Sequence, residues 1–243
     1  MYMVKSMKKL FEKHETLFCI LLIILYVGSN SFCVQKFGNT SWVSFVINTV
    51  LSAFLIAMII VLKRVSYYGL TRVKSIKKYL YFIPLIPLVS VNLWSGININ
   101  NSSSEILFHI LTMINVGFIE EIIFRGFLFK MMAKNNVKSA VIVSTLTFGI
   151  GHIINLLNGA ELIATLLQVC YAISVGYLFV VIFQKSKSLI PCIIVHSLTN
   201  SLSIFNIDNT ISLYVAPAFL IIVPLVYALY INKSTAGENC EVS

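Results

Sequence analysis

Charged side chains are scarce in this sequence. They make up 11% of the 243 residues, whereas a soluble domain usually carries about a quarter. Apolar residues make up 58%, and the mean hydropathy is +0.90. This composition excludes an ordinary water-soluble protein and favours a bilayer, in which each spanning helix needs roughly 20 mostly apolar residues. We therefore expect an all-α, polytopic membrane helix bundle.

Other features of common protein classes are also missing. No soluble linker, low-complexity segment or internal repeat interrupts the chain, so we expect one integral membrane domain over residues 1–243, with the functional core at 120–200. The five cysteines form no CxxC pair and show no metal-ligand spacing, which indicates reduced packing residues. The net charge of +9 does not indicate a nucleic-acid partner, because the basic residues lie in short runs between apolar stretches.

Eight apolar runs of about the length of a membrane span follow one another along the chain. We expect about eight transmembrane helices. The runs lie at about 17–35, 42–62, 79–97, 106–129, 139–157, 161–183, 188–205 and 211–231. Prolines inside several runs exclude none of them, because membrane helices tolerate proline. The first run also has features of a cleaved signal peptide, but its apolar stretch continues to Val34.

The basic residues indicate the orientation of these helices. All but one of the 18 lysines and arginines fall in the N-terminal segment, in alternate loops or in the tail, and Lys36 alone lies on the other side. Basic loops remain on the cytoplasmic side of a membrane. The sequence therefore predicts a multi-pass protein of the cell membrane with both termini cytoplasmic, and the basic 63–78 loop is expected to contact anionic lipid headgroups.

Ionisable residues inside three of the expected spans are the candidate functional residues, since they are costly in a membrane. The fourth span contains Glu120, Glu121 and Arg125, the fifth His152, and the seventh His196 with the amide Asn200. Glu121 and Arg125, Phe148 and His152, and His196 and Asn200 are pairs four residues apart, so the members of each pair share a helix face. Counted from the lysines that end each span, the two glutamates, the two histidines and Asn200 lie in the cytoplasmic half or near the midplane, ~13–21 Å along their helices.

The adjacent carboxylates are expected to differ in their partners. Arg125 lies on the face of Glu121, whereas Glu120 is about 100° away around the helix. Two carboxylates with different partners can acquire different pKa values, as acid–base chemistry requires. Gly149 and Gly151 remove side chains next to His152, which allows a close helix approach or a small water-filled space.

Three short patterns in three of the expected spans resemble, in the same order, the three motifs of the CPBP family. They are Glu-Glu-x-x-x-Arg, Phe-x-x-x-His and His-x-x-x-Asn. That family includes CAAX prenyl endopeptidases, abortive-infection proteins and lysostaphin-resistance-type proteins. The resemblance implies an intramembrane glutamate-type protease that needs no cofactor and no metal. Glu120 would act with His152 to deprotonate a water, and His196 and Asn200 would stabilise the oxyanion. Glu121 and Arg125 would support Glu120, and Phe148 would pack behind His152.

Other interpretations remain open. Two histidines and a glutamate are a common zinc set, but no HExxH pair is present. A non-catalytic immunity or scaffold protein would use the same residues as a structural polar network, and a proton-coupled transporter would carry a membrane glutamate. Ser197 is an unsuitable nucleophile because nothing places a base against it. His14 is expected to be solvated, and His109 is expected to be a surface or packing residue.

The substrate is expected to be a membrane-associated peptide or protein. Abundant Ile, Asn and Lys resemble a low-GC bacterial protein, which favours peptide processing or bacteriocin self-immunity over prenylated C-termini. The C-terminal Cys240-Glu241-Val242-Ser243 has the outline of a prenylation box. We interpret it as coincidental, because Glu241 occupies an aliphatic position of that motif and the helices already anchor the chain.

Overall fold

The structure is a computed structural model that describes residues 2–73 and 82–234. The described residues form helices and connecting turns, without strands. Six helical segments among them are long and apolar enough to cross a membrane: Glu15–Phe37, Trp42–Val61, Ser103–Ala133, Val137–Leu157, Leu162–Ser186 and Ile211–Lys233. The prediction of an all-α, polytopic membrane bundle is therefore confirmed.

Two of the eight expected spans form shorter helices. Of the run at 79–97, residues 79–81 lie outside the described part, and most of the remainder forms α4 (Leu85–Ser90) and the 3₁₀ turn η2 (Val91–Leu93). Pro84 directly precedes α4 and Pro87 lies in its first turn, where the fixed φ and missing N–H of proline are tolerated. The run at 188–205 forms α10 (Ile190–Leu202) and η4 (Ser203–Phe205), below the length of a span.

The other elements follow the predicted runs closely. The segment with both glutamates is continuous but changes its winding: α5 (Ser103–Glu121) passes into the π-helix η3 (Ile122–Phe129) and then into α6 (Lys130–Ala133). The remaining elements are α1 (Tyr2–Lys13), α2 (Glu15–Phe37), α3 (Trp42–Val61), α7 (Val137–Gly151), α8 (Ile154–Leu157), α9 (Leu162–Ser186), the π-helix η5 (Ile211–Val215) and α11 (Ala216–Ser234).

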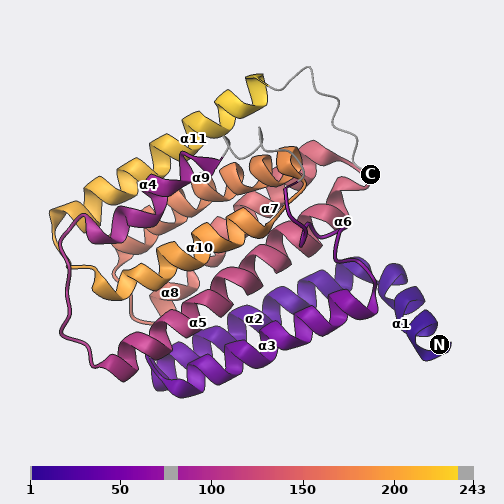
Figure 1. Cartoon of the computed structure of the whole chain (residues 1–243), viewed down its shortest axis with the longest axis horizontal. Helices are drawn as coiled ribbons and strands as arrows, with labels where there is room; N and C mark the ends of the chain where they lie inside the picture. Colours follow the sequence, from indigo (N-terminus) through magenta and orange to yellow (C-terminus); the bar gives the residue numbers. More distant parts are fainter. Residues whose placement is uncertain (1, 74–81, 235–243) are drawn as a thin grey trace.

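Figure 1 shows the arrangement of the bundle. Helices α2 and α3 lie side by side at one edge, α4 and α11 lie at the opposite edge, and α5, α10, α7 and α9 lie between them. The interior helices α5 with η3 and α9 bury about half of their residues, whereas α2 and α3 bury about a quarter. Large aliphatic side chains such as Ile24 and Leu25 point outward from α2. This exterior suits hydrocarbon rather than water.

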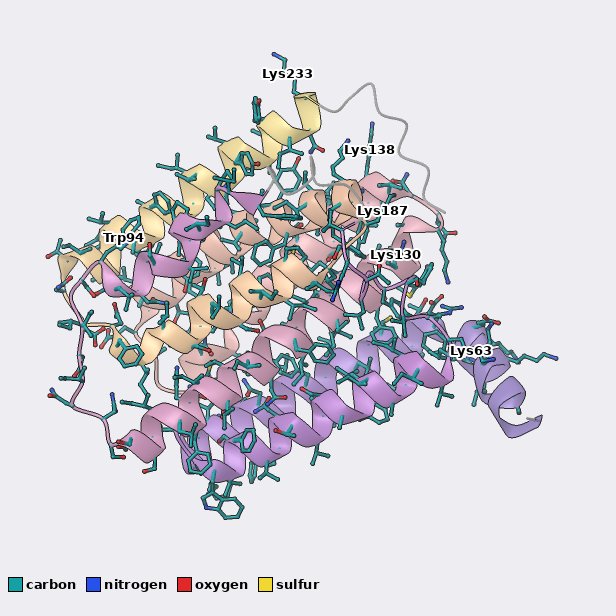
Figure 2. The ribbon with its side chains drawn as sticks, viewed as in Figure 1. Lys63, Trp94, Lys130, Lys138, Lys187 and Lys233 are labelled. Carbon is teal, nitrogen blue, oxygen red and sulfur yellow. The ribbon has the colours of Figure 1, made fainter. Side chains whose placement is uncertain are left out.

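One end of the bundle carries the labelled lysines. Figure 2 shows Lys63, Lys130, Lys138, Lys187 and Lys233 at this end and Trp94 at the opposite end. The alternation of basic and non-basic loops along the sequence thus corresponds to two ends of one bundle. We call the first the lysine-rich end.

The loop after α3 differs from its expected role at the lipid surface. Tyr68 is buried, and its ring lies 4.6 Å from that of Phe127. Arg64 binds Glu12 at 2.9 Å and Glu15 at 3.2 Å. Parts of this loop therefore hold the bundle together, because their aromatic and charged groups find partners within the protein. The loop's residues 74–78 and the tail with Cys240 lie outside the described residues.

Candidate active site

The ionisable residues of the three motifs meet inside the bundle. Glu120 and Glu121 are the last residues of α5, with exposed fractions of 8% and 0%, and Arg125 lies in the following π-helix and is fully buried. His152 ends α7, and His196 lies in the middle of α10. A π-helical turn is rare and often occurs at functional sites. Here it directly follows the two carboxylates.

Glu121 and Arg125 form a buried ion pair, as their spacing predicts. Arg125 Nη1 donates to Glu121 Oε1 over 3.1 Å, and both side chains are completely buried. The Arg125 guanidinium also lies 4.0 Å above the centre of the Phe148 ring. A buried ion pair needs such additional contacts, because the attraction of the two charges alone does not offset their desolvation.

His196 contacts both carboxylates. Its Nδ1 lies 2.8 Å from Glu121 Oε1, and its Nε2 lies 3.3 Å from Glu120 Oε2. The family resemblance pairs His196 with Asn200 in oxyanion stabilisation and does not predict this bridge. Close packing of α10 on α5 makes it possible: a Cβ at Gly117 would lie 2.7 Å from the backbone nitrogen of Ser197. Only glycine at that position lets the two helices approach this closely.

Glu120 has a further partner that sequence reasoning missed. The hydroxyl of Tyr26, on α2, donates a 2.5 Å hydrogen bond to Glu120 Oε1. Tyr26 is 3% exposed and lies outside the three motifs. Tyr26, Asn30 and the neighbouring Ser31 interrupt the apolar first span, and this polar run is the signal that could have identified it. The two glutamates thus do have different partners, Tyr26 for one and Arg125 for the other.

His152 lies where α7 breaks. Gly149, three residues earlier, allows α7 to approach α9, since a Cβ there would lie 3.1 Å from the backbone oxygen of Val169. Gly151 has no atoms nearby and instead borders a small cavity. The His152 ring packs edge-on against Phe148 at a centroid distance of 5.2 Å. Both structural roles expected of these glycines are therefore present.

Two cavities border His152. The first has a volume of about 50 Å³ and is also lined by Tyr26, Glu120 and Asn155. The second has a volume of about 100 Å³ and is also lined by His196, Asn200 and Gln168. Phe148 and His152 line both cavities. The wall between the two spaces is thus formed in part by the second motif.

Asn200 and His109 are linked through the backbone. His109, on α5, is 7% exposed, and its Nε2 lies 3.2 Å from the backbone oxygen of Asn200 and 3.1 Å from Ser203 Oγ. His109 therefore is a packing residue, as expected, and it holds the end of the helix that carries Asn200. Ser197 Oγ donates to the backbone oxygen of Ile114 over 3.2 Å. Its hydroxyl ties α10 to α5.

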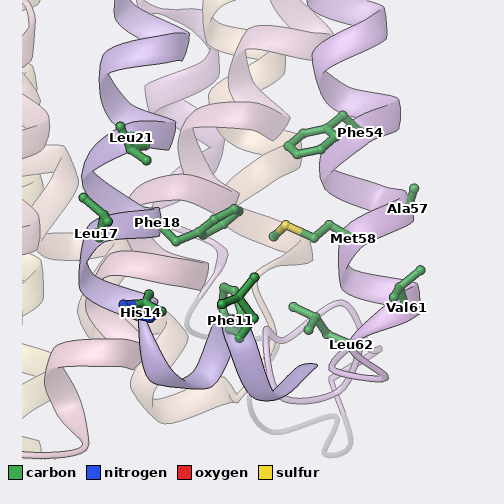
Figure 3. Close-up of a pocket in the computed structure, with 11 residues that line it drawn as sticks. Phe11, His14, Leu17, Phe18, Leu21, Phe54, Ala57, Met58, Val61 and Leu62 are labelled. Atoms are coloured by element: carbon green, nitrogen blue, oxygen red, sulfur yellow. The ribbon is translucent and has the colours of Figure 1, made fainter. Parts of the chain in front are cut away.

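A larger apolar pocket lies away from these residues. It has a volume of about 570 Å³, occurs between α1, α2 and α3, and is lined by carbon-rich side chains and His14 (Figure 3). None of the motif residues borders it. Within residues 2–73 and 82–234, no group of three or more His, Cys, Asp or Glu side chains is arranged to hold a metal ion.

Comparison with known families agrees with the motifs. Residues 102–202 match the family described as type II CAAX prenyl endopeptidase Rce1-like. No curated protein and no solved structure matches the chain. The matched segment runs from the start of α5 to the end of α10 and contains all three motifs. The match supports the resemblance of the three motifs in this multi-pass membrane protein to those of the CPBP family of CAAX-type membrane endopeptidases.

Proposed function

We propose that the protein is an intramembrane endopeptidase in which Glu120 activates a water molecule to cleave a membrane-associated peptide or protein. The observation that carries the proposal is the shared cavity of Glu120 and His152. These residues come from different helices, yet they border one small space inside the membrane bundle. Its volume of about 50 Å³ is sufficient for a water with several polar neighbours.

The carboxylate of Glu120 is the general base in this proposal. It accepts a proton from the water while the water oxygen attacks the carbonyl carbon of the scissile peptide bond. The resulting tetrahedral intermediate then expels the amine, which takes up the proton held by Glu120. His152 orients the water from the opposite wall. Such a positioned acid–base group contributes ~10²-fold to 10⁴-fold to a rate.

His196 and Asn200 are the proposed oxyanion donors. Both border the 100 Å³ cavity on the other side of His152. The Nδ1 of His196 is held by Glu121 at 2.8 Å, which fixes the ring and leaves Nε2 as the nitrogen that faces Glu120 at 3.3 Å. Oxyanion donors act on the charge that develops in the transition state.

Glu121, Arg125 and Phe148 support this site in the proposal. Their ion pair and cation–π contact are fully buried, so they hold α5 and α7 in one arrangement without contacting the reacting atoms. Arginine does not exchange protons at the pH of a cell, because its guanidinium stays charged. The chemistry needs no metal and no covalent enzyme intermediate.

The substrate in this proposal approaches through the membrane. An apolar groove of about 710 Å³ lies between α4 and α10, and its wall residue Val195 also borders the 100 Å³ cavity. An apolar or membrane-spanning segment of the substrate fits such a surface better than a soluble peptide does. We place the lysine-rich end, and with it both termini, on the cytoplasmic side of the cell membrane. Peptide processing or bacteriocin self-immunity in a bacterium is the proposed biological role.

The test is peptide release or complementation at matched membrane levels of each variant. Glu120→Gln and His152→Ala should each lose ~10²-fold to 10⁴-fold in activity, and the double variant should be little worse, because the two groups act as a unit. Asn200→Ala removes one donor and should retain more activity. Tyr230→Phe, on the exposed face of α11, is the control.

Two outcomes would overturn the proposal. If Glu120→Gln and His152→Ala both complement fully, the protein does not act by hydrolysis. The alternative, a binding role as an immunity or scaffold protein, then takes the place of the proposal. Inhibition by a chelator that zinc alone reverses would replace the glutamate mechanism by a zinc mechanism.

A further inference from the structure

Water must reach the Glu120–His152 cavity, and the described residues between that cavity and the lysine-rich end are closely packed. Every residue of η3, which runs from the carboxylates toward that end, is buried. Phe127 packs against Phe11 and Phe18 at ring-centroid distances of 6.1 and 5.9 Å. Phe11 and Phe18 also border the apolar pocket of Figure 3. Aromatic packing of this kind excludes water from the space below the site.

A stripe of polar side chains runs from the same cavity toward the opposite end. It lies on α2, where Tyr26 and Asn30 are four residues apart, as are Ser31 and Gln35, so that each pair shares a face and the two pairs together wind about half a turn around the helix. Tyr26, Asn30 and Ser31 border the 50 Å³ cavity, and Gln35 is exposed near the end of the helix. Polar side chains inside a membrane span are costly and usually face the bundle interior or a water-filled space.

The broken end of α7 faces this stripe. The chain turns at His152–Ile153 and forms the short helix α8, so that Asn155 and Asn158 also border the cavity. Only six residues separate His152 from Asn158, or ~9 Å if they were helical, so the outer surface is close to the site along this segment. Asn155 donates to Gln168 over 2.8 Å, and Gln168 borders the second cavity.

Asn158 contacts the end of the stripe that is nearer the exposed surface. Its Oδ1 accepts hydrogen bonds from Ser31 Oγ at 2.6 Å and from Gln35 Nε2 at 3.0 Å. Gln35 Nε2 also lies 3.2 Å from Ser31 Oγ. Three neutral polar groups from two segments thus meet between the cavity and the exposed surface. Hydrogen bonds of this kind exchange readily with water, because their net contribution to stability is small.

We infer that water enters the site from the end opposite the lysines, along the stripe of polar side chains on α2, through a gate formed by Ser31, Gln35 and Asn158. The inference deepens the proposed hydrolysis, since it names the route of the attacking water. It does not depend on that reaction for its test, because entry of water can be measured without proteolysis.

The experiment is thiol labelling in a variant whose five cysteines are replaced. Asn30→Cys places a thiol on the route, Leu25→Cys places one on the outward face of α2, and Leu128→Cys places one in the packed segment of η3. A small charged methanethiosulfonate reacts with the thiolate, which forms only where water is present. We expect Asn30→Cys to react at least ~10-fold faster than either control, and only when the reagent is added to the face opposite the lysine-rich end.

A matched pair at the gate tests its role. Asn158→Leu keeps the size of the side chain but cannot accept a hydrogen bond, and it should slow labelling of Asn30→Cys about tenfold. Asn158→Ala removes the obstruction and should accelerate it. Equal labelling of Asn30→Cys and Leu25→Cys, or labelling from the lysine-rich side, would overturn the inference. Neither result bears on the proposed function, which the Glu120→Gln variant tests separately.

Discussion

The hydroxyl of Tyr26 donates a 2.5 Å hydrogen bond to Oε1 of Glu120, although the two residues are 94 positions apart. This contact joins the first membrane helix to the matched segment at residues 102–202. The opposite oxygen of Glu120 faces Nε2 of His196 at 3.3 Å. The two contacts hold the carboxylate from both sides, so its orientation depends on α2 and α10 at once.

Tyr26→Phe tests this orientation. The variant loses one hydrogen bond to a charged group, which is worth about 1.5–3 kcal/mol. If Glu120 is the base, kcat should fall by about tenfold or more while KM stays unchanged, because the phenol orients the base and does not bind the substrate. Tyr230→Phe, whose tyrosine is 64% exposed, is the matched control. A change in KM alone would argue for a substrate contact of Tyr26.

Gly117→Ala tests the close packing of α5 on α10. The added Cβ would lie 2.5 Å from Ser197 Oγ and 2.7 Å from its backbone nitrogen, so the helices must separate. We expect a loss of about 1–3 kcal/mol in the free energy of unfolding and a lower melting temperature in detergent. Activity should fall as well, because His196 precedes Ser197 and moves with it. Gly28→Ala has open space around its Cβ and should be neutral. Equal melting temperatures of the two variants would contradict the packing argument.

Arg125 is expected to support the fold and to take no part in proton transfer. Arg125→Ala leaves the buried Glu121 without its ion-pair partner and should cost about 3–5 kcal/mol, so folded protein and activity are lost together. Adding Glu121→Gln removes the stranded charge and should restore much of the folded protein. The measurement is the yield of monodisperse protein for the two single variants and the double variant. A fully folded but inactive Arg125→Ala variant would contradict the assignment.

The orientation of the bundle can be tested with two serines. Ser66 lies in the exposed loop at the lysine-rich end, and Ser104 lies in the exposed first turn of α5 at the other end. In a cysteine-free background, an impermeant thiol reagent added to intact cells should label Ser104→Cys strongly and Ser66→Cys only after the membrane is opened. Strong labelling of Ser66→Cys in intact cells would reverse the proposed topology.

The sequence predicted the membrane bundle because hydropathy and lysine placement are local properties of each segment. It also predicted the Glu121–Arg125 pair, since both residues belong to one continuous helical segment. Six helices among the described residues reach the length of a span, where the sequence predicts about eight. Prolines and turns shorten the helices at 79–97 and 188–205, and apolar composition alone does not reveal where a helix stops.

The contacts between helices were decided only by the tertiary structure. The rotation of α10 about its own axis brings His196 to both glutamates, and the rotation of α2 brings Tyr26 to Glu120. These rotations depend on how small residues such as Gly117 and Gly149 let neighbouring backbones approach. The sequence by itself indicated which polar residues lie in the apolar helices and about how far along each helix they lie, because the rise per residue of an α-helix is constant. Packing decided which of them face one another, because the side chains of many residues on several helices set each helix's rotation together.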